Sequence, residues 1–235
     1  MDLIACIFLV VVAFGFPIAV LLYLLISKRQ YLLSFLVGIF TFLIFQVFTR
    51  IPLIQIVLPN MSWYFILQNK YVILYCLFLG LTAGLFEEVG RYIMMKLFMK
   101  KRHRFIDAVV FGLGHGGIEA VLLVGINALL LLVQNQSIAG NSLSLYLSGT
   151  ERISAMILHV TWSIMVMKSI RTNKQIYLIM AFIGHALLDS AVALLSMSGF
   201  DMIMLELILL IIAVFSLIYI MRYALHWEVQ NEETH

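Results

Sequence analysis

The hydrophobic residues of this chain gather in long, nearly uninterrupted stretches that short polar segments separate. Each of these stretches comes close to the ~20 apolar residues that an α-helix needs to cross ~30 Å of hydrocarbon. We predict the following membrane-spanning helices: Leu3–Ile26, Tyr31–Thr49, Tyr71–Met95, Phe105–Val133, Arg152–Met167, Gln175–Ser196 and Met202–Leu225.

The stretches are continuously apolar, whereas the strands of a membrane barrel alternate between apolar and polar residues. A spanning segment must also satisfy its own backbone hydrogen bonds, which favours helices. The predicted fold is therefore an all-α polytopic bundle that forms one membrane domain over residues 1–235. Ile51–Asn69 is apolar but contains Pro52 and Pro59, which predicts an interfacial or re-entrant piece on the outer side. The polar segment Gln134–Thr150 is expected to be an outer loop.

The composition agrees with a membrane protein. Of the 235 residues, 63% are hydrophobic and only 11% are charged, whereas a soluble domain usually has about 25% charged residues. A water-soluble protein of this size needs more charged side chains to keep its surface hydrated. We therefore predict an integral membrane protein.

Lysine and arginine concentrate in the loops on one side of the predicted bundle. These basic segments are Lys28–Arg29, Lys96–Arg104, Lys168–Lys174 and Arg222, and the opposite side carries only Arg50, Lys70 and Arg152. Because basic loops stay in the cytoplasm, we predict the N-terminus outside and the C-terminus inside. The run Lys100–Arg104 is explained by anionic lipid headgroups, and we expect no nucleic-acid partner.

Ionisable side chains lie inside four of the predicted spans, although each costs roughly 2.5–3.5 kcal/mol at the bilayer centre. They are Glu87, Glu88 and Arg91 on the third span, His115 and Glu119 on the fourth, His159 on the fifth, and His185 and Asp189 on the sixth. Residues four apart share a helix face, and the helical rise puts these groups near one depth. We predict that they meet around one water-holding cavity.

Simpler interpretations exist for single members of this set. His159 alone could be a polar contact between helices. Glu88 could be a structural partner of Arg91, and Glu119 could serve only to orient His115. Gly80, Gly84 and the glycines from Gly112 to Gly117 would let neighbouring helices approach closely.

Four short motifs follow one another along the chain: Glu87-Glu88-Val-Gly-Arg91, Phe111-Gly-Leu-Gly-His115, an isolated His159, and His185-Ala-Leu-Leu-Asp189. Over residues about 80–195 this order resembles the motif set of the glutamate-dependent membrane peptidases. That superfamily includes the type II CAAX prenyl proteases, the bacterial CPBP proteins and the PrsW proteases. The stretch Gly-Leu-Gly-His-Gly-Gly-Ile-Glu, residues 112–119, most resembles the small bacterial YhfC-type membrane metallopeptidases. Two departures are that Arg91 comes one residue earlier than in the CAAX proteases, and that the last motif ends in Asp189 instead of asparagine.

The resemblance implies an intramembrane endopeptidase of the bacterial cytoplasmic membrane that cleaves membrane-embedded or membrane-bound proteins or peptides. The catalytic residues that it implies are Glu87, Glu88, Arg91, His115, His185 and Asp189. Glu87 with His115 would hold and deprotonate a water molecule, and His185 beside Asp189 would stabilise the oxyanion or the leaving amine. Arg91 would set which glutamate is the base.

A catalytic metal is the open question. Neutral histidines and carboxylates could hold Zn²⁺ with one position left for water, and the candidate ligands are His115, Glu119, His159 and His185. A mechanism with only glutamate and histidine stays open beside it. So do a metal-ion or proton-coupled transporter, although no inverted repeat supports it, and a non-enzymatic immunity-type protein built on the same scaffold.

Overall fold

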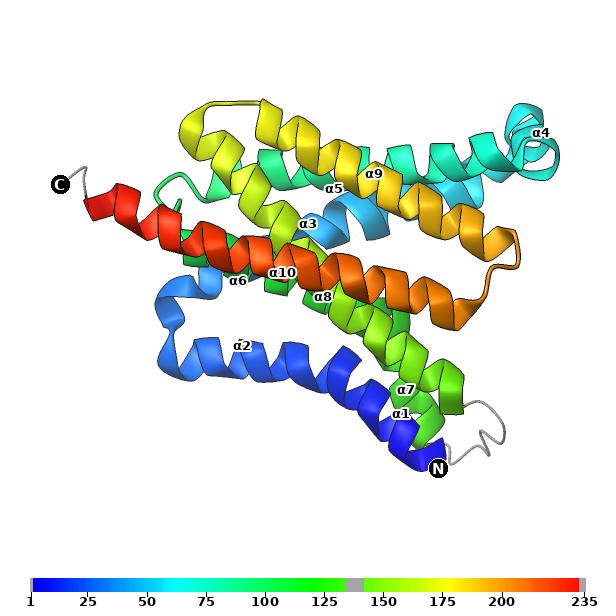
Figure 1. Ribbon diagram of the computed structural model, residues 1–235, viewed down its shortest axis with the longest axis horizontal. Coiled ribbons are helices and arrows are strands. Elements are labelled where there is room, and N and C mark those ends of the chain that lie inside the picture. The colour runs from blue at the N-terminus through cyan, green and yellow to red at the C-terminus, as the bar shows by residue number, and fades with distance from the viewer. Residues whose placement is uncertain (1, 134–141, 233–235) are drawn as a thin grey trace. The chain divides into compact units, whose positions relative to one another are not determined.

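The computed structural model describes residues 2–133 and 142–232, and within these residues every regular element is a helix (Figure 1). Within these described residues, seven helical segments are long and apolar enough to cross a membrane, which confirms the predicted all-α bundle. These candidate spans are Leu3–Ser27, Arg29–Asn60, Val72–Phe98, Phe105–Val133, Ser142–Thr172, Ile176–Met197 and Met202–Arg222. The side of the membrane that each terminus faces stays a prediction.

The contacts divide the chain into two compact units. Unit 1 takes the described residues of 1–39, 102–164 and 206–235, and unit 2 takes 40–101 and 165–205. Three helices run from one unit into the other, namely α3 (Leu32–Phe42), α8 (Ser142–Thr172) and α10 (Met202–Glu232). A single functional domain over the whole chain stays a prediction.

Unit 1 contains two spans that are each built from three consecutive helical pieces. The first joins α1 (Asp2–Val10), η1 (Val11–Gly15) and α2 (Phe16–Ser27), and the second joins α6 (Phe105–Ala120), η6 (Val121–Gly125) and α7 (Ile126–Val133). In the first span the wide π-turn lies just before Pro17. Because proline lacks an N–H and its ring crowds the preceding turn, such a local widening keeps the helix continuous.

Glycines bring α3 and α6 into close contact within unit 1. A Cβ on Gly38 would overlap the carbonyl oxygen of Phe111, and a Cβ on Gly114 would overlap that of Phe35. No larger residue fits at either position without moving a backbone. The expected role of glycine in close helix approach is confirmed here.

Unit 2 is built around a pair of long helices, α5 (Val72–Phe98) and α9 (Ile176–Met197), which lie side by side (Figure 1). Its remaining pieces are η3 (Leu43–Arg50), η4 (Leu53–Val57), η5 (Leu58–Asn60) and α4 (Ser62–Lys70). Small residues again set the spacing, because a Cβ on Gly84 would lie 2.9 Å from the carbonyl oxygen of Phe182.

The second span is longer than predicted. It continues through Pro52 as far as Asn60, so the expected break after Thr49 is wrong. Pro52 has φ −59°, which suits a helix, and π-helical turns lie on both sides of it, in η3 and η4. These wide turns accommodate the missing N–H and the bulk of the proline ring.

The fifth span also starts earlier than predicted, because α8 begins at Ser142 and not at Arg152. Residues 134–141 of the predicted loop lie outside the described residues. In α8 the Thr150 hydroxyl donates to the Tyr146 carbonyl at 3.0 Å, and the Ser154 hydroxyl donates to the Thr150 carbonyl at 3.1 Å. Hydroxyls that bond one turn back are satisfied inside the helix, so this polar composition does not end it. Arg152 consequently lies within a span.

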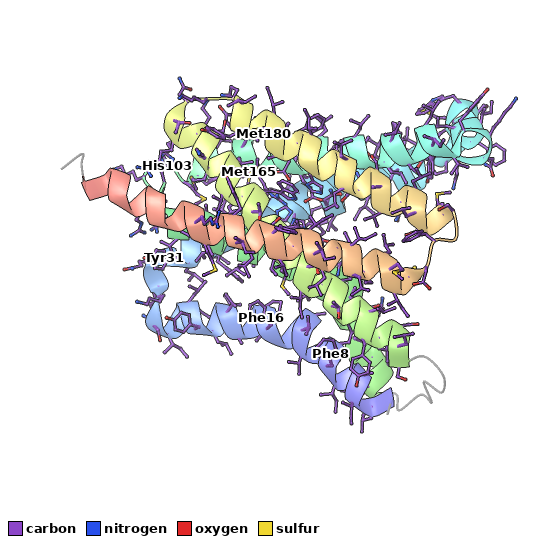
Figure 2. All side chains as sticks on the ribbon, in the orientation of Figure 1. Phe8, Phe16, Tyr31, His103, Met165 and Met180 are labelled. Atoms are coloured by element: carbon purple, nitrogen blue, oxygen red, sulfur yellow. The ribbon has the colours of Figure 1, made fainter. Side chains whose placement is uncertain are left out.

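Large apolar side chains point outward from the spans of both units (Figure 2). Phe16 on α2 is 44% exposed and Met180 on α9 is 51% exposed. Surface of this kind is costly in water and favourable in hydrocarbon. Together with the seven apolar spans, it makes the protein an integral membrane protein that is embedded in a lipid bilayer.

Candidate functional site

Among the described residues, the candidate site residues of the sequence form two groups, one in each unit. The α5–α9 cluster of unit 2 contains Glu87, Glu88, Arg91, His185 and Asp189. The α6–α8 cluster of unit 1 contains His115, Glu119, Arg152 and His159. Each cluster joins two helices that are far apart in the sequence, and each is described here within its own unit.

Arg91 binds both glutamates of the α5–α9 cluster. Its Nη2 donates to Glu87 Oε2 at 3.0 Å and its Nη1 donates to Glu88 Oε1 at 2.8 Å. The guanidinium and Glu88 are fully buried, and Glu87 is nearly so. A fork of two donors neutralises the adjacent carboxylates better than a lysine could. Arg91 therefore does not choose between the two glutamates.

His185 distinguishes the two glutamates. Its Nδ1 lies 2.7 Å from Glu88 Oε1, while its Nε2 lies 4.0 Å from Glu87 Oε1 and 3.6 Å from Asp189 Oδ2. Because Glu88 is an ion-paired carboxylate that only accepts, His185 donates from Nδ1. The Nε2 edge of the ring is thereby directed toward Glu87 and the half-exposed Asp189.

Gln46 of η3 is a further member of the α5–α9 cluster that the sequence analysis did not single out. Its Nε2 donates to Glu87 Oε1 at 2.6 Å. Arg50, one turn later, donates to Gln46 Oε1 at 3.2 Å and to the Leu79 carbonyl at 2.8 Å. The sequence feature that could have identified these two residues is a glutamine and an arginine four residues apart in an apolar stretch. The predicted second span ends at Thr49, so the sequence places Arg50 in a loop.

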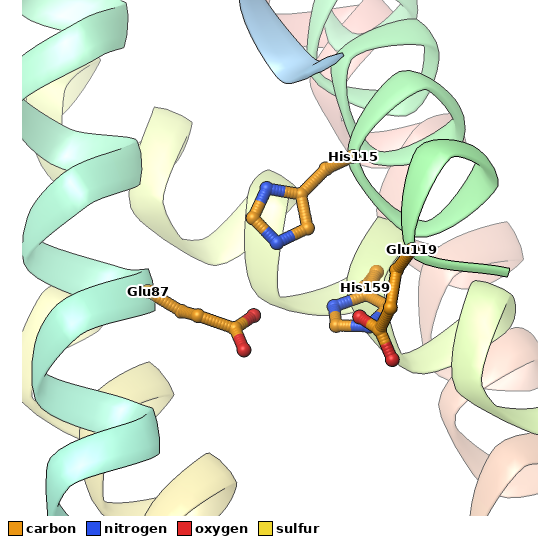
Figure 3. Close-up of side chains that lie close together, drawn as sticks. All are labelled: Glu87, His115, Glu119 and His159. Atoms are coloured by element: carbon orange, nitrogen blue, oxygen red, sulfur yellow. The ribbon is translucent and has the colours of Figure 1, made fainter. Parts of the chain in front are cut away.

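Glu119 links the residues of the α6–α8 cluster. Its Oε2 lies 2.6 Å from Nε2 of His159, and its Oε1 accepts from Arg152 Nη1 at 2.9 Å. The ring centroids of His115 and His159 are 5.0 Å apart, and the two ring planes are tilted by 47°. Figure 3 shows these two imidazoles and the carboxylate turned toward one another. Glu119 thus orients His159, whereas the sequence had suggested His115 as its partner.

The backbone of α6 explains how His159 reaches this position. A Cβ on Gly116 would lie 3.0 Å from Cδ2 of His159, and a Cβ on Gly112 would lie 2.6 Å from Cα of Val160. Glycines at these two positions form a groove along α6 into which α8 packs. The histidine ring can therefore lie beside His115 without moving either helix.

The comparisons with known proteins identify the family of this chain. The model of the YhfC intramembrane metalloprotease family matches residues 10–144 and 127–210. The chain belongs to this family. It is also 28% identical over 214 residues to the uncharacterized membrane protein YhfC of Bacillus subtilis strain 168, in a match that covers 76% of this chain and 79% of that protein. No solved structure matches the chain.

The name of the YhfC family points to a metal, and the donor atoms of the α6–α8 cluster suit one. His115, Glu119 and His159 offer two imidazole nitrogens and a carboxylate oxygen within 4.8 Å of one another. Two histidines and one glutamate are a known ligand set of catalytic zinc, which leaves a fourth position open. A second group of donors, Glu87, Glu88 and His185, lies in the α5–α9 cluster. Arg91 pairs with both carboxylates there, and the group has one imidazole. In the α6–α8 cluster Arg152 pairs with one oxygen of Glu119, and two imidazoles are present. The α6–α8 cluster is therefore the better fit for a cation.

Arg152 is the second residue that the sequence analysis did not identify. The sequence predicts a cation at the membrane surface, yet the side chain of Arg152 is only 11% exposed and binds both Glu119 and Glu151. A carboxylate partner that fixes the orientation of a ligand histidine is common around protein-bound metals. Here Arg152 fixes the carboxylate in turn.

Proposed function

We propose that this chain is an intramembrane endopeptidase that hydrolyses peptide bonds of membrane-embedded or membrane-bound proteins with an activated water. The observation that carries the proposal is the pair formed by Glu87 Oε1 and His185 Nε2, which are 4.0 Å apart in a buried, rigidly held cluster. A water molecule can lie within hydrogen-bond distance of both atoms. Membership of the YhfC family and the apolar spans support the same reaction class.

In the proposed reaction Glu87 is the general base. It takes a proton from the water as the oxygen attacks the carbonyl carbon, and a tetrahedral oxyanion forms. The protonated Glu87 then passes this proton to the amine nitrogen as the C–N bond breaks. Glu87 is the better candidate because Glu88 is fully buried and is bound by Nδ1 of His185, while Nε2 of the same ring faces Glu87.

His185 and its neighbours would stabilise the developing charge. In its protonated form the imidazole can donate from Nε2 to the oxyanion, while Nδ1 remains bonded to Glu88. Asp189, on the same helix face, lies 3.6 Å from Nε2 and would help to hold the ring. Arg91, Glu88 and Gln46 are positioning residues in this scheme, because they bind Glu87 or His185.

In the α6–α8 cluster His115, His159 and Glu119 would hold a Zn²⁺ ion, which supplies a Lewis acid when bound. Bacterial cytoplasmic membrane is the proposed location, since the matched relative comes from Bacillus subtilis.

The decisive experiment is cleavage of fluorogenic transmembrane peptides by the purified protein in liposomes. We expect Glu87→Gln to lower the rate by about 10²–10⁴, because glutamine keeps the shape but cannot accept the proton. The matched control is Glu206→Gln on α10, another buried acid of a span, which should cleave as the wild type does. Similar melting of both variants would show that the loss is chemical, and full cleavage by Glu87→Gln would disprove the assignment.

A further inference from the structure

Unit 1 contains a cavity of about 540 Å³ whose lining is wholly apolar. Its walls come from the α1–α2 span, α6, α8 and α10, and they include Phe16, Val109, Leu113, Ile157, Leu217 and Ile220. The volume is within the usual range of small-molecule binding sites. All of the lining residues lie within candidate membrane spans.

The cavity is separate from the α6–α8 cluster. Leu113 comes two residues before His115, and Ile157 comes two residues before His159. Residues two apart in an α-helix point in nearly opposite directions, roughly 200° apart around the axis. None of the four residues of the α6–α8 cluster lines the cavity.

The lining restricts what can occupy the cavity. Its side chains supply no hydrogen-bond donor or acceptor, so an extended peptide would bury amide groups without partners. A hydrocarbon chain has no such groups and gains from every methylene that it buries. The occupant that the lining fits is an acyl chain.

One end of the cavity adjoins a basic rim formed by Lys28, Arg29, Arg102 and Arg104. Phe105, which lines the cavity, directly follows Arg104 at the start of α6. Arg102 donates to the Gln30 carbonyl, and the Arg104 guanidinium lies 4.9 Å from the centroid of the Tyr31 ring. These contacts hold the start of α6 against the turn that contains Lys28 and Arg29. The positions of Phe16 and Tyr31, at the cavity and beside the rim, are labelled in Figure 2.

The charges of the rim remain available to an anion. Asp107 is fully buried and accepts hydrogen bonds from Arg104 and Ser34. Arg104 nevertheless keeps 52% of its side chain exposed, and Lys28 and Arg29 are exposed as well. A phosphate at this level would meet several cations next to Phe105 of the cavity lining.

We propose that unit 1 binds one anionic phospholipid, with an acyl chain in this cavity and the phosphate at the basic rim. The two parts of the site make separable contributions. The cavity provides affinity for the chain whatever the headgroup is, and the rim provides the preference for negative charge.

The test is native mass spectrometry of the full-length protein titrated with dioleoyl phosphatidylglycerol or dioleoyl phosphatidylcholine. Wild type should bind phosphatidylglycerol more tightly. Val109→Trp fills the cavity and should weaken binding of both lipids about tenfold or more. Ile183→Trp is the matched control, since Ile183 is 47% exposed on α9 and does not line the cavity. Leu217→Trp tests the opposite wall should Val109→Trp not fold.

The rim is tested by the double variant Lys28→Gln/Arg29→Gln. It should bind phosphatidylcholine as the wild type does and lose about tenfold of its affinity for phosphatidylglycerol. Equal wild-type affinity for both lipids would overturn the anionic site. Unchanged binding by a folded tryptophan variant of the cavity would overturn the acyl-chain site.

Discussion

At the residue scale, Glu119 is the centre of the α6–α8 cluster. One carboxylate oxygen lies beside His159 and the other beside Arg152. Because Oε2 of Glu119 lies 2.6 Å from Nε2 of His159, this carboxylate fixes the orientation of the ring. The residues that would hold a metal are thus oriented by an arginine that does not bind it.

We predict that Arg152→Met lowers zinc affinity by about 10–100-fold, the usual cost of losing a partner of a metal-bound side chain. Arg152→Lys keeps the charge and should recover part of the affinity. The measurement is zinc per protein by elemental analysis during titration with a chelator. Arg171→Met, at the end of the same helix, serves as the control.

Two outcomes would contradict this picture in different ways. If the wild-type protein contains no zinc and still cleaves with chelator present, the zinc site is disproved and the Glu87 mechanism is unaffected. If Arg152→Met and the wild type bind zinc with the same affinity, the positioning role of Arg152 is disproved.

At the scale of helices, glycine positions decide which spans pair. Gly80 of α5 packs directly on the backbone of α9 at Ala186 and Ser190. This contact fixes the distance between the helix that carries Glu88 and the helix that carries His185. Their hydrogen bond of 2.7 Å leaves little tolerance for a change in that distance.

We predict that Gly80→Leu destabilises the protein by roughly 1–3 kcal/mol, as overpacking usually does. The added side chain would overlap the α9 backbone and separate the two helices. Gly15→Ala is the control, because a Cβ there would be 3.8 Å from its nearest neighbour, Val10 O. Thermal unfolding in detergent should show a clear drop for Gly80→Leu alone. Equal melting temperatures would mean that α5 and α9 do not pack as described.

Helix continuity is a second property of the elements. Prolines at 17 and 52 lie inside spans, each next to a π-helical turn. A wide turn also shifts the face on which later side chains project. In the second span such turns include Gln46 and Arg50, and Gln46 bonds Glu87.

At the scale of the whole molecule, the predicted orientation follows from the distribution of lysine and arginine. The α8–α9 turn carries Lys174, and the α9–α10 turn contains Ser198 and no basic residue. The positive-inside rule therefore predicts that these two turns lie on opposite sides of the membrane.

Cysteine labelling in intact cells tests this orientation. Ser198→Cys should react with a membrane-impermeant maleimide, whereas Lys174→Cys should react only after permeabilisation. The native cysteines, Cys6 and Cys76, are buried and should contribute little background. The reverse pattern of labelling would invert the predicted topology.

The sequence by itself determined the class of protein and its candidate residues. Long apolar stretches can only be helices in hydrocarbon, and acids and histidines inside them are too costly to occur without a partner or a function. Glycine spacing indicated where helices would approach. These properties depend on composition and helical period, which can be read along one dimension.

The ends of the second and fifth spans could not be read in this way. Proline breaks or kinks a helix, and serine and threonine are weak helix formers. Here π-turns beside Pro52 and hydroxyls of Thr150 and Ser154 that bond one turn back let the helices continue. The sequence therefore predicts Arg50 in a loop and Arg152 at the outer end of a span, although both lie inside helices.

Only the tertiary structure decided the partners. Spacing of four residues correctly placed Arg91 near Glu87, but that Arg91 binds both glutamates, that His185 bonds Glu88, and that Glu119 bonds His159 and Arg152 depended on packing. The reason is physical: helical period fixes the face on which a residue lies, whereas the rotation and depth of each helix fix what that face meets.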